Sequence, residues 1–458
     1  MTPEDTFGIE ATVIDAPVLG EVRIREQALV VVNDAGTIEH VMEAGEPAHA
    51  VARDELIDRG ALHHFGDGAY LLPGLIDLHN HAPQWPQLGK ALDIPLEDWL
   101  ERYTFPLEAR YDDLDFADRV YESLVDSMVA NGTTTATYFA TTHLRATQRL
   151  ADICLARGQR ALIGKVAMDH PDGCPEYYRD PSAEAAIDQT IQLIDYIKHH
   201  PDNQMSLLRP VITPRFLPSC TDDLLRGLGE LASETSCHVQ THCSESDWAH
   251  QYGLTRFGQT DTETYQDFGL LTSRTVLAHS NFITDTDAET IISAGASVAH
   301  CPLSNIFFSN AVFPAREALD SGMHIGLGTD VSGGSSPSIL RACADAVAVS
   351  RIREDGANAR LPHAVRGTPE TRLNFSEALW MATTGGGLAL GLPIGVLAPG
   401  YSFDAIVVDA NVEDTDLMFW PELDTVPDVL QKIIHNGIRR NITSVWVQGR
   451  LIKSPEND

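Results

Sequence analysis

The sequence predicts an α/β protein in which a (β/α)8 barrel of the TIM type carries a small β-sandwich domain formed by both termini. Three observations lead to this expectation. Eight apolar, strand-like runs alternate with amphipathic, helix-like stretches through the middle of the chain. Short β-type runs occupy both ends. Several middle runs end in histidine, arginine or aspartate, at the barrel edge where catalytic residues gather.

The distribution of these strand-like and helix-like runs along the chain predicts the domain organisation. Residues 1–72, with runs such as ALVVVNDAGTIEHVME, and residues 398–458, with YSFDAIVVDA and SVWVQGRLIK, are expected to form one composite β-sandwich domain. Residues 73–397 are expected to form the barrel, with a long excursion at 354–372 after its last strand. The eight expected barrel strands are residues 75–81, 133–140, 160–169, 206–216, 238–246, 275–282, 296–305 and 324–330.

Composition limits the class of protein. The 458 residues are 43% hydrophobic, which is enough for a sizeable core, yet no apolar run is long enough for a membrane span. The acidic N-terminus lacks the basic-then-apolar layout of a signal peptide. The seven cysteines are scattered without a CxxC pair, which favours a reducing interior over a disulfide framework or a thiolate metal site. A cytoplasmic location is therefore expected.

The charge is strongly acidic, with 32 Lys plus Arg against 65 Asp plus Glu and a net charge of −33. This balance opposes binding to nucleic acid or to an anionic membrane. The protein could be an ordinary acidic cytosolic protein, or it could be adapted to a salt-rich cytoplasm. Lysine occurs only five times, which favours the halophilic interpretation.

Salt should therefore stabilise the fold. Ions shorten the Debye length from about 10 Å at 0.1 M to about 3 Å at 1 M, which screens the repulsion between surface carboxylates. The melting temperature is expected to rise between about 0.1 M and about 3 M KCl, with sucrose as a control for general exclusion effects. A melting temperature independent of KCl would refute the salt-adapted interpretation.

The most informative stretch is LIDLHNH, residues 75–81. Alternate residues of a strand share a face, so His79 and His81 are expected to point at a common ion. An isolated His-x-His could equally be a pair of hydrogen-bonded core histidines. His242 and Asp330 end other expected strands, as do Arg215 and His279, and this alignment favours a metal. Three histidines and an aspartate suit zinc.

Two further residues at these strand ends suggest chemistry. Glu245 follows His242 by three residues, which suits a carboxylate that moves a proton from water to a leaving group. Its alternative role is that of a neighbour of a helix N-cap, because Ser244 and Ser246 resemble capping residues. His279 could hydrogen-bond the attacking oxygen, or it could be a buried structural histidine.

The combined motifs resemble a known family. PGLIDLHNH, THCSE, LAHS and GLGTD resemble the amidohydrolase superfamily. HAPQW (81–85), TPRF (213–216), AHCPLSN (299–305) and GLGTDVSGG (326–334) resemble, within it, the guanine deaminases, and the similarity extends over nearly the whole chain. His-x-His alone is a weak signal, whereas the combination is specific.

The resemblance implies a role for each matching residue. One zinc ion per subunit would be held by four ligands, namely His79, His81, His242 and Asp330. Glu245 would shuttle the proton, and His279 and Asp330 would orient the attacking oxygen. The purine would contact Gln84, Arg215, Phe216, His242, Glu245 and Asp330. A second metal is not expected, because the fourth strand lacks lysine and Lys165, on the third, is expected to pack or to form a buried ion pair.

The implied reaction is hydrolytic deamination of guanine to xanthine and ammonia, catalysed by a homodimer. Two other interpretations stay open. The protein could be a related deaminase acting on another purine, a pterin or a triazine. It could also be a catalytically silent relative, which the presence of every ligand and of the base disfavours.

Overall fold

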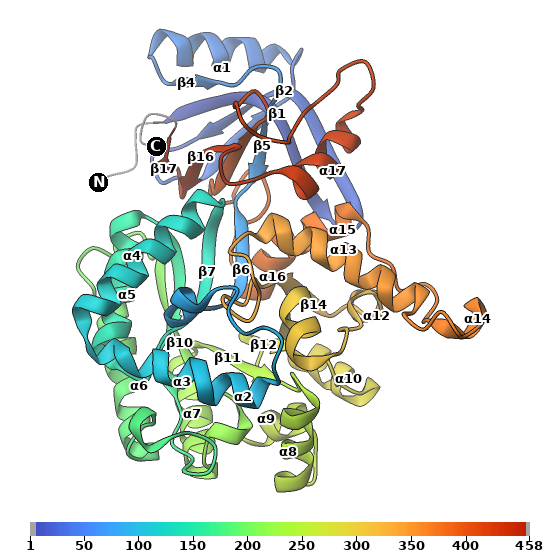
Figure 1. The fold of residues 1–458 in the computed structure, drawn as a ribbon. Coiled ribbons are helices and arrows are strands. Elements are labelled where there is room, and N and C mark those ends of the chain that lie inside the picture. The colour runs from blue at the N-terminus through green and yellow to red at the C-terminus, as the bar shows by residue number, and fades with distance from the viewer. Residues whose placement is uncertain (1–5, 455–458) are drawn as a thin grey trace.

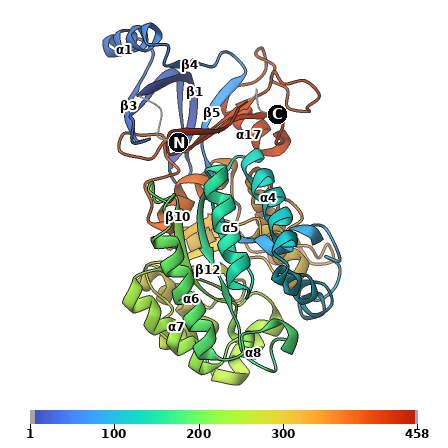
Figure 2. The same ribbon diagram turned by 90° about the vertical axis from the view of Figure 1, so that its left-hand side faces the viewer.

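The computed structural model describes residues 6–454. A barrel surrounded by helices forms the lower part of the molecule, and a second β-rich part lies above it (Figures 1 and 2). The second part combines the blue start and the red end of the chain, as expected. No helix between residues 6 and 454 has both the length and the apolar character of a membrane-crossing segment.

The barrel sheet confirms the expected fold class. Its strands pair in parallel with their sequence neighbours, from β6 at one edge to β14 at the other. The short β9 (Val166–Ala167) adds to β10. The strands are β6 (Leu75–His81), β7 (Thr133–Phe139), β8 (Arg160–Gly164), β10 (Leu208–Pro214), β11 (His238–Cys243), β12 (Thr275–His279), β13 (Ser297–His300) and β14 (His324–Leu327).

Hydrogen bonds beyond the end of β14 join the two edge strands. The Asp330 N–H donates to the His79 carbonyl, and the His81 N–H donates to the Val331 carbonyl, both at 2.9 Å. The buried Asp77 carboxylate accepts from the Thr329 N–H at 3.0 Å and from its hydroxyl at 2.5 Å. These contacts place the Asp330 side chain beside the two histidines of β6.

Every barrel strand except β6 ends earlier than expected, and the ends of β11, β12 and β14 lie closest to the metal-compatible side chains. β11, β12 and β14 stop at Cys243, His279 and Leu327. Local backbone geometry ends β11 and β12, because Ser244 and His279 have φ of +44° and +68° and a strand cannot continue through this left-handed region. Asp330, three residues beyond the end of β14, has φ of +48°. Such positions cost about 1–3 kcal/mol each when the residue is not glycine, and they concentrate at functional sites.

Helices connect the strands along the outside of the barrel, where α5, α6 and α7 lie side by side (Figure 2). Side-chain caps begin many of them: Asp113, Ser182 and Thr221 accept first-turn N–H bonds from α4, α6 and α7. The longer helices are α4 (Leu114–Ala130), α5 (Leu144–Arg157), α6 (Ala183–Lys198), α7 (Asp222–Thr235), α8 (Asp247–Phe257), α9 (Asp261–Asp267), α10 (Asp285–Ala294) and α13 (Ile339–Asp355).

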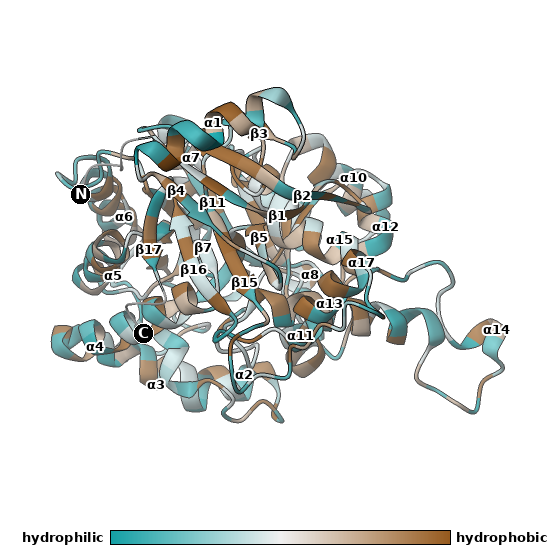
Figure 3. Ribbon diagram, turned by 90° about the horizontal axis from the view of Figure 1, so that it is seen from above, coloured by the Kyte–Doolittle hydropathy of each residue, from teal (hydrophilic) through white to brown (hydrophobic). Residues whose placement is uncertain are grey.

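Shorter helices complete the barrel: α2 (Leu96–Trp99), α3 (Phe105–Glu108), α11 (Pro302–Ser304), α12 (Ala315–Asp320), α15 (Phe375–Trp380) and α16 (Gly386–Leu390). After α13 the chain projects away from the body and carries α14 (His363–Arg366), which is clearest from above (Figure 3). The projection lies where the long excursion at 354–372 was expected.

The second sheet has the order β17-β16-β15-β5-β1-β2-β3, with β4 on β1. Its apolar core unites strands from both ends of that order, since Ile38 of β3 and Trp446 of β16 share one cluster with Phe7 and Phe403. The sheet therefore folds over itself as a small sandwich. Its elements are β1 (Phe7–Val18), β2 (Glu21–Val32), β3 (Ile38–Met42), α1 (Pro47–Asp58), β4 (Leu62–His64), β5 (Ala69–Pro73), β15 (Ala405–Asp409), α17 (Val426–Asn436), β16 (Ile442–Val447) and β17 (Arg450–Lys453).

Candidate active site

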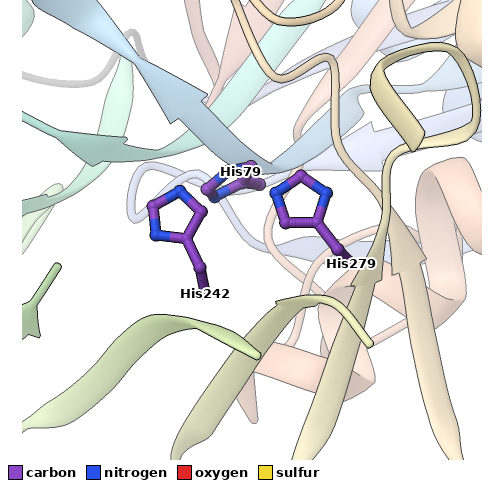
Figure 4. Close-up of side chains that lie close together, drawn as sticks. All are labelled: His79, His242 and His279. Atoms are coloured by element: carbon purple, nitrogen blue, oxygen red, sulfur yellow. The ribbon is translucent and has the colours of Figure 1, made fainter. Parts of the chain in front are cut away.

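Four histidines and two carboxylates meet at the C-terminal ends of the barrel strands. His79 and His81 come from β6, His242 from β11 and His279 from β12. Figure 4 shows His79, His242 and His279 pointing toward one another. Asp330 and Glu245 follow β14 and β11, and all six side chains are buried.

The donor atoms fit a divalent cation. Nε2 of His81 lies 2.9 Å from Nε2 of His242, and Nε2 of His79 lies 3.3 Å from Oδ1 of Asp330. His242 Nδ1 donates to the Arg215 carbonyl at 2.6 Å, so its Nε2 carries a lone pair. The buried Nε2 of His79 has no hydrogen-bond partner in the described structure. A cation bound between these nitrogen and oxygen atoms would satisfy lone pairs that otherwise face one another with no proton between them.

The protonation states agree with metal binding. Burial holds the pKa of His79, His81 and His242 well below the usual range, and the neighbouring histidines lower it further. These imidazoles are therefore neutral, which is the form that coordinates a metal. Metal-compatible groups of side chains are His79–His81–Asp330, His79–His242–His279 and Glu245–His279–Asp330, each with ligand atoms within 4.8 Å of one another.

Glu245 faces this cluster. Its carboxylate lies 3.6 Å from His279 Nε2. Burial raises the pKa of Glu245 well above its usual range, Asp330 raises it further, and Arg215 opposes the shift. Ser246 is the N-cap of α8 and accepts from the Ala249 N–H at 3.2 Å, so Glu245 is also the neighbour of an N-cap, while its own side chain borders the pocket. Glu245 is thus free to exchange a proton with a ligand.

His279 is oriented by a residue that the sequence did not single out. Its Nδ1 lies 2.9 Å from Oδ1 of Asn305, and its Nε2 has no hydrogen-bond partner in the described structure. Asn305 is the last residue of the AHCPLSN motif, and this motif is the sequence feature that could have identified it. With one ring nitrogen engaged, the other is directed at the metal-compatible cluster.

A pocket opens beside the cluster. Apolar side chains from the segment around α2 and from residue 308 form part of its wall, and Trp99 and Phe308 contact each other with ring centroids 4.8 Å apart. The sequence did not predict this apolar wall. The pocket is lined by His81, Gln84, Leu96, Trp99, Leu100, Arg215, Phe216, His242, Glu245, Phe308, Asp330 and Gly333. Every residue expected to contact the purine therefore borders it.

A carboxylate that the sequence also missed lies behind the polar end of the pocket, in contact with Gln84 and Arg215 of its lining. Glu108 is fully buried at the end of α3 and accepts hydrogen bonds from both Gln84 and Arg215. It lies in an acid-rich stretch, EDWLERYTFPLEARYDD, in which nothing distinguishes it from its exposed neighbours. Only the fold brings it to Arg215, 107 residues away.

Lys165 does not face the cluster. Its ammonium lies 2.6 Å from Asp180 and donates to the Val166 carbonyl at 3.1 Å, within the barrel wall. Of the two expected roles, the buried ion pair is therefore the observed one.

Comparisons with known proteins agree with the geometry. Residues 70–452 match the family model described as Amidohydrolase family. The chain is 38% identical to the probable guanine deaminase of Schizosaccharomyces pombe, covering 97% of this chain and 82% of that protein. It is 36% identical to the guanine deaminase of Dictyostelium discoideum, covering 97% of both.

A solved structure is similar over the same length. The guanine deaminase of C. acetobutylicum, with guanine bound in its active site, superposes with a TM-score of 0.87 at 29% identity, covering 98% of this chain and 100% of that one. The family model and the identity to these relatives together show which family the chain belongs to. The chain belongs to the amidohydrolase family and, within it, to the guanine deaminases.

Proposed function

We propose that this protein is a zinc-dependent guanine deaminase that hydrolyses guanine to xanthine and ammonia. The observation that carries the proposal is one pocket bordered by a metal-compatible His/Asp cluster, a buried glutamate, and the donors Gln84 and Arg215. A planar neutral base needs such a combination of apolar wall and hydrogen-bonding edge. The similarity to relatives with this activity supports it.

His79, His81, His242 and Asp330 would hold one zinc ion. Zinc bound there would lower the pKa of a bound water molecule to about 7 and so supply a nucleophile at neutral pH. We assign His279 to orienting the attacking oxygen rather than to the ligand set, because its Nε2 lies 3.6 Å from the Glu245 carboxylate that moves the proton.

The protein's own groups then guide the reaction. Glu245 takes a proton from the attacking water and delivers it to N3 of guanine as the oxygen adds to C2. His279 and Asp330 orient that oxygen. Arg215 donates to O6, and Phe216 packs against the purine. The remaining hydroxyl proton then passes to the amino group, by way of the Glu245 carboxylate, as the C–N bond breaks; ammonia leaves, the C2 carbonyl of xanthine forms, and one guanine and one water are consumed.

A substrate screen tests the proposal. The zinc-loaded enzyme is offered guanine, 8-oxoguanine, adenine, cytosine and pterin, and ammonia release is measured, with chelated enzyme as the control. Guanine is expected to be turned over at least about tenfold more efficiently than any other compound. A base with a different pattern of hydrogen-bonding groups would leave buried donors of the pocket unpaired. Faster ammonia release from pterin or another purine would identify that compound as the substrate in place of guanine. Hydrolytic deamination would remain the reaction type.

Three further features belong to the same proposal. The acidic composition supports a salt-adapted cytoplasm. The reduced state of all seven buried cysteines is compatible with a cytoplasmic location. The functional unit is proposed to be a homodimer with one zinc ion in each subunit, which analytical ultracentrifugation combined with elemental analysis tests.

A further inference from the structure

We propose that Glu108 is a positioning residue that sets which purines the site accepts. It would act by holding Gln84 and Arg215 in a single donor–acceptor arrangement. The inference rests on the proposed function, because it concerns the recognition edge of the same pocket.

Glu108 holds both purine-binding candidates at once. Its Oε1 accepts from Gln84 Nε2 at 2.9 Å and from Arg215 Nη2 at 3.1 Å, and its Oε2 accepts from Arg215 Nη1 at 2.5 Å. All three side chains are buried. The two-point carboxylate–guanidinium contact fixes the plane of the Arg215 fork, which a single contact would not.

The carboxylate also decides which way the Gln84 amide faces. An ionised carboxylate only accepts hydrogen bonds, so the amide nitrogen must point at Glu108. The amide oxygen of Gln84 then accepts from the Ser332 N–H at 3.3 Å and keeps one lone pair for a ligand. A flipped amide would place two acceptors against each other and two donors against each other.

The resulting edge selects a substrate class. Arg215 carries donors only, and each Nη that contacts Glu108 retains a second N–H for a ligand. The atom opposite Arg215 must therefore be an acceptor, such as a 6-oxo group, whereas the amine of a 6-aminopurine would meet a donor. Gln84, which offers its oxygen, suits a ligand N–H. Neutral 6-oxopurines match this edge.

The pair also controls charge. Glu108 pairs with Arg215 from behind the pocket lining, so this edge of the pocket presents no unpaired guanidinium charge to the ligand. Removing the carboxylate's charge would leave a buried, unpaired guanidinium, which attracts anions strongly. Loss of Glu108 should thus weaken binding of neutral 6-oxopurines and strengthen binding of anionic ones. A merely structural residue would produce no such opposite shifts.

The test is Glu108→Gln in the zinc-loaded enzyme. For guanine, KM is expected to rise about tenfold or more, with a smaller change in kcat. The inhibition constant of hypoxanthine, a 6-oxopurine, should rise similarly while that of adenine, a 6-aminopurine, stays within about twofold. The inhibition constant of xanthine should fall at a pH where xanthine is an anion. Glu122→Gln, exposed on α4, serves as the matched control.

Inhibition constants do not depend on how much of the variant is folded, so partial misfolding does not blur the result. If Glu108→Gln yields no soluble protein, Glu108→Asp is measured instead. Its carboxylate is one methylene shorter and should lower the ratio of adenine to hypoxanthine inhibition constants partway. Equal weakening of adenine, hypoxanthine and xanthine overturns the proposal. A wild-type enzyme that releases no ammonia from guanine overturns the proposed function instead.

Discussion

Replacing Glu245 by Gln is expected to lower kcat for guanine by about 10²-fold or more while zinc and purine remain bound. The amide has nearly the same size and shape as the buried carboxyl, so it can take the same place 3.6 Å from His279 Nε2. It carries no transferable proton, so water loses its base and the ring nitrogen loses its acid. Steady-state kinetics, elemental analysis and calorimetric titration with guanine measure the three quantities separately.

The control for this substitution is Glu289→Gln, on the exposed side of α10, which should behave as wild type. Turnover by Glu245→Gln near the wild-type rate would remove Glu245 from the chemistry. Loss of zinc from the variant would instead make the residue a ligand, because its carboxylate belongs to a metal-compatible group with His279 and Asp330.

Removing a metal ligand should have the larger effect. His79→Ala and Asp330→Asn are expected to lose most of their zinc on dialysis, and kcat should fall by about 10³-fold or more, because no other group lowers the pKa of water so far. Asn is chosen at position 330 because φ there is +48°, a conformation that Asn tolerates better than Ala. Elemental analysis and turnover are measured on the same samples.

His324→Ala provides the matched control, since His324 lies at the exposed start of β14 and Asp330 follows the other end of that strand. It should retain full zinc and activity. Full zinc occupancy in both ligand variants would exclude His79 and Asp330 from the ligand set. Zinc loss in His79→Ala alone would point to His279 in place of Asp330, because His279 forms a metal-compatible group with His79 and His242.

The barrel and its central cluster could be predicted because both are encoded locally. Apolar runs of strand length, separated by helical periodicity, predict parallel strands and crossover helices wherever they occur. The ends of such strands must meet at one edge. His79, His81, His242 and Asp330 were therefore placed together without knowledge of any contact. The β-rich ends, by the same local pattern, predicted the second sheet.

The tertiary structure alone decided how that cluster is held and what it can recognise. Strands β11 and β12 end earlier than expected because Ser244 and His279 adopt left-handed backbone, and residue types other than glycine do not predict this conformation. Asp77 ties β6 to Thr329, 252 residues away, and Glu108 meets Arg215 across 107 residues. The physical reason is that a buried carboxylate bonds to whichever donors the fold brings near it. The local hydrophobic pattern predicts strands and helices but does not indicate which distant donor will lie beside a given carboxylate.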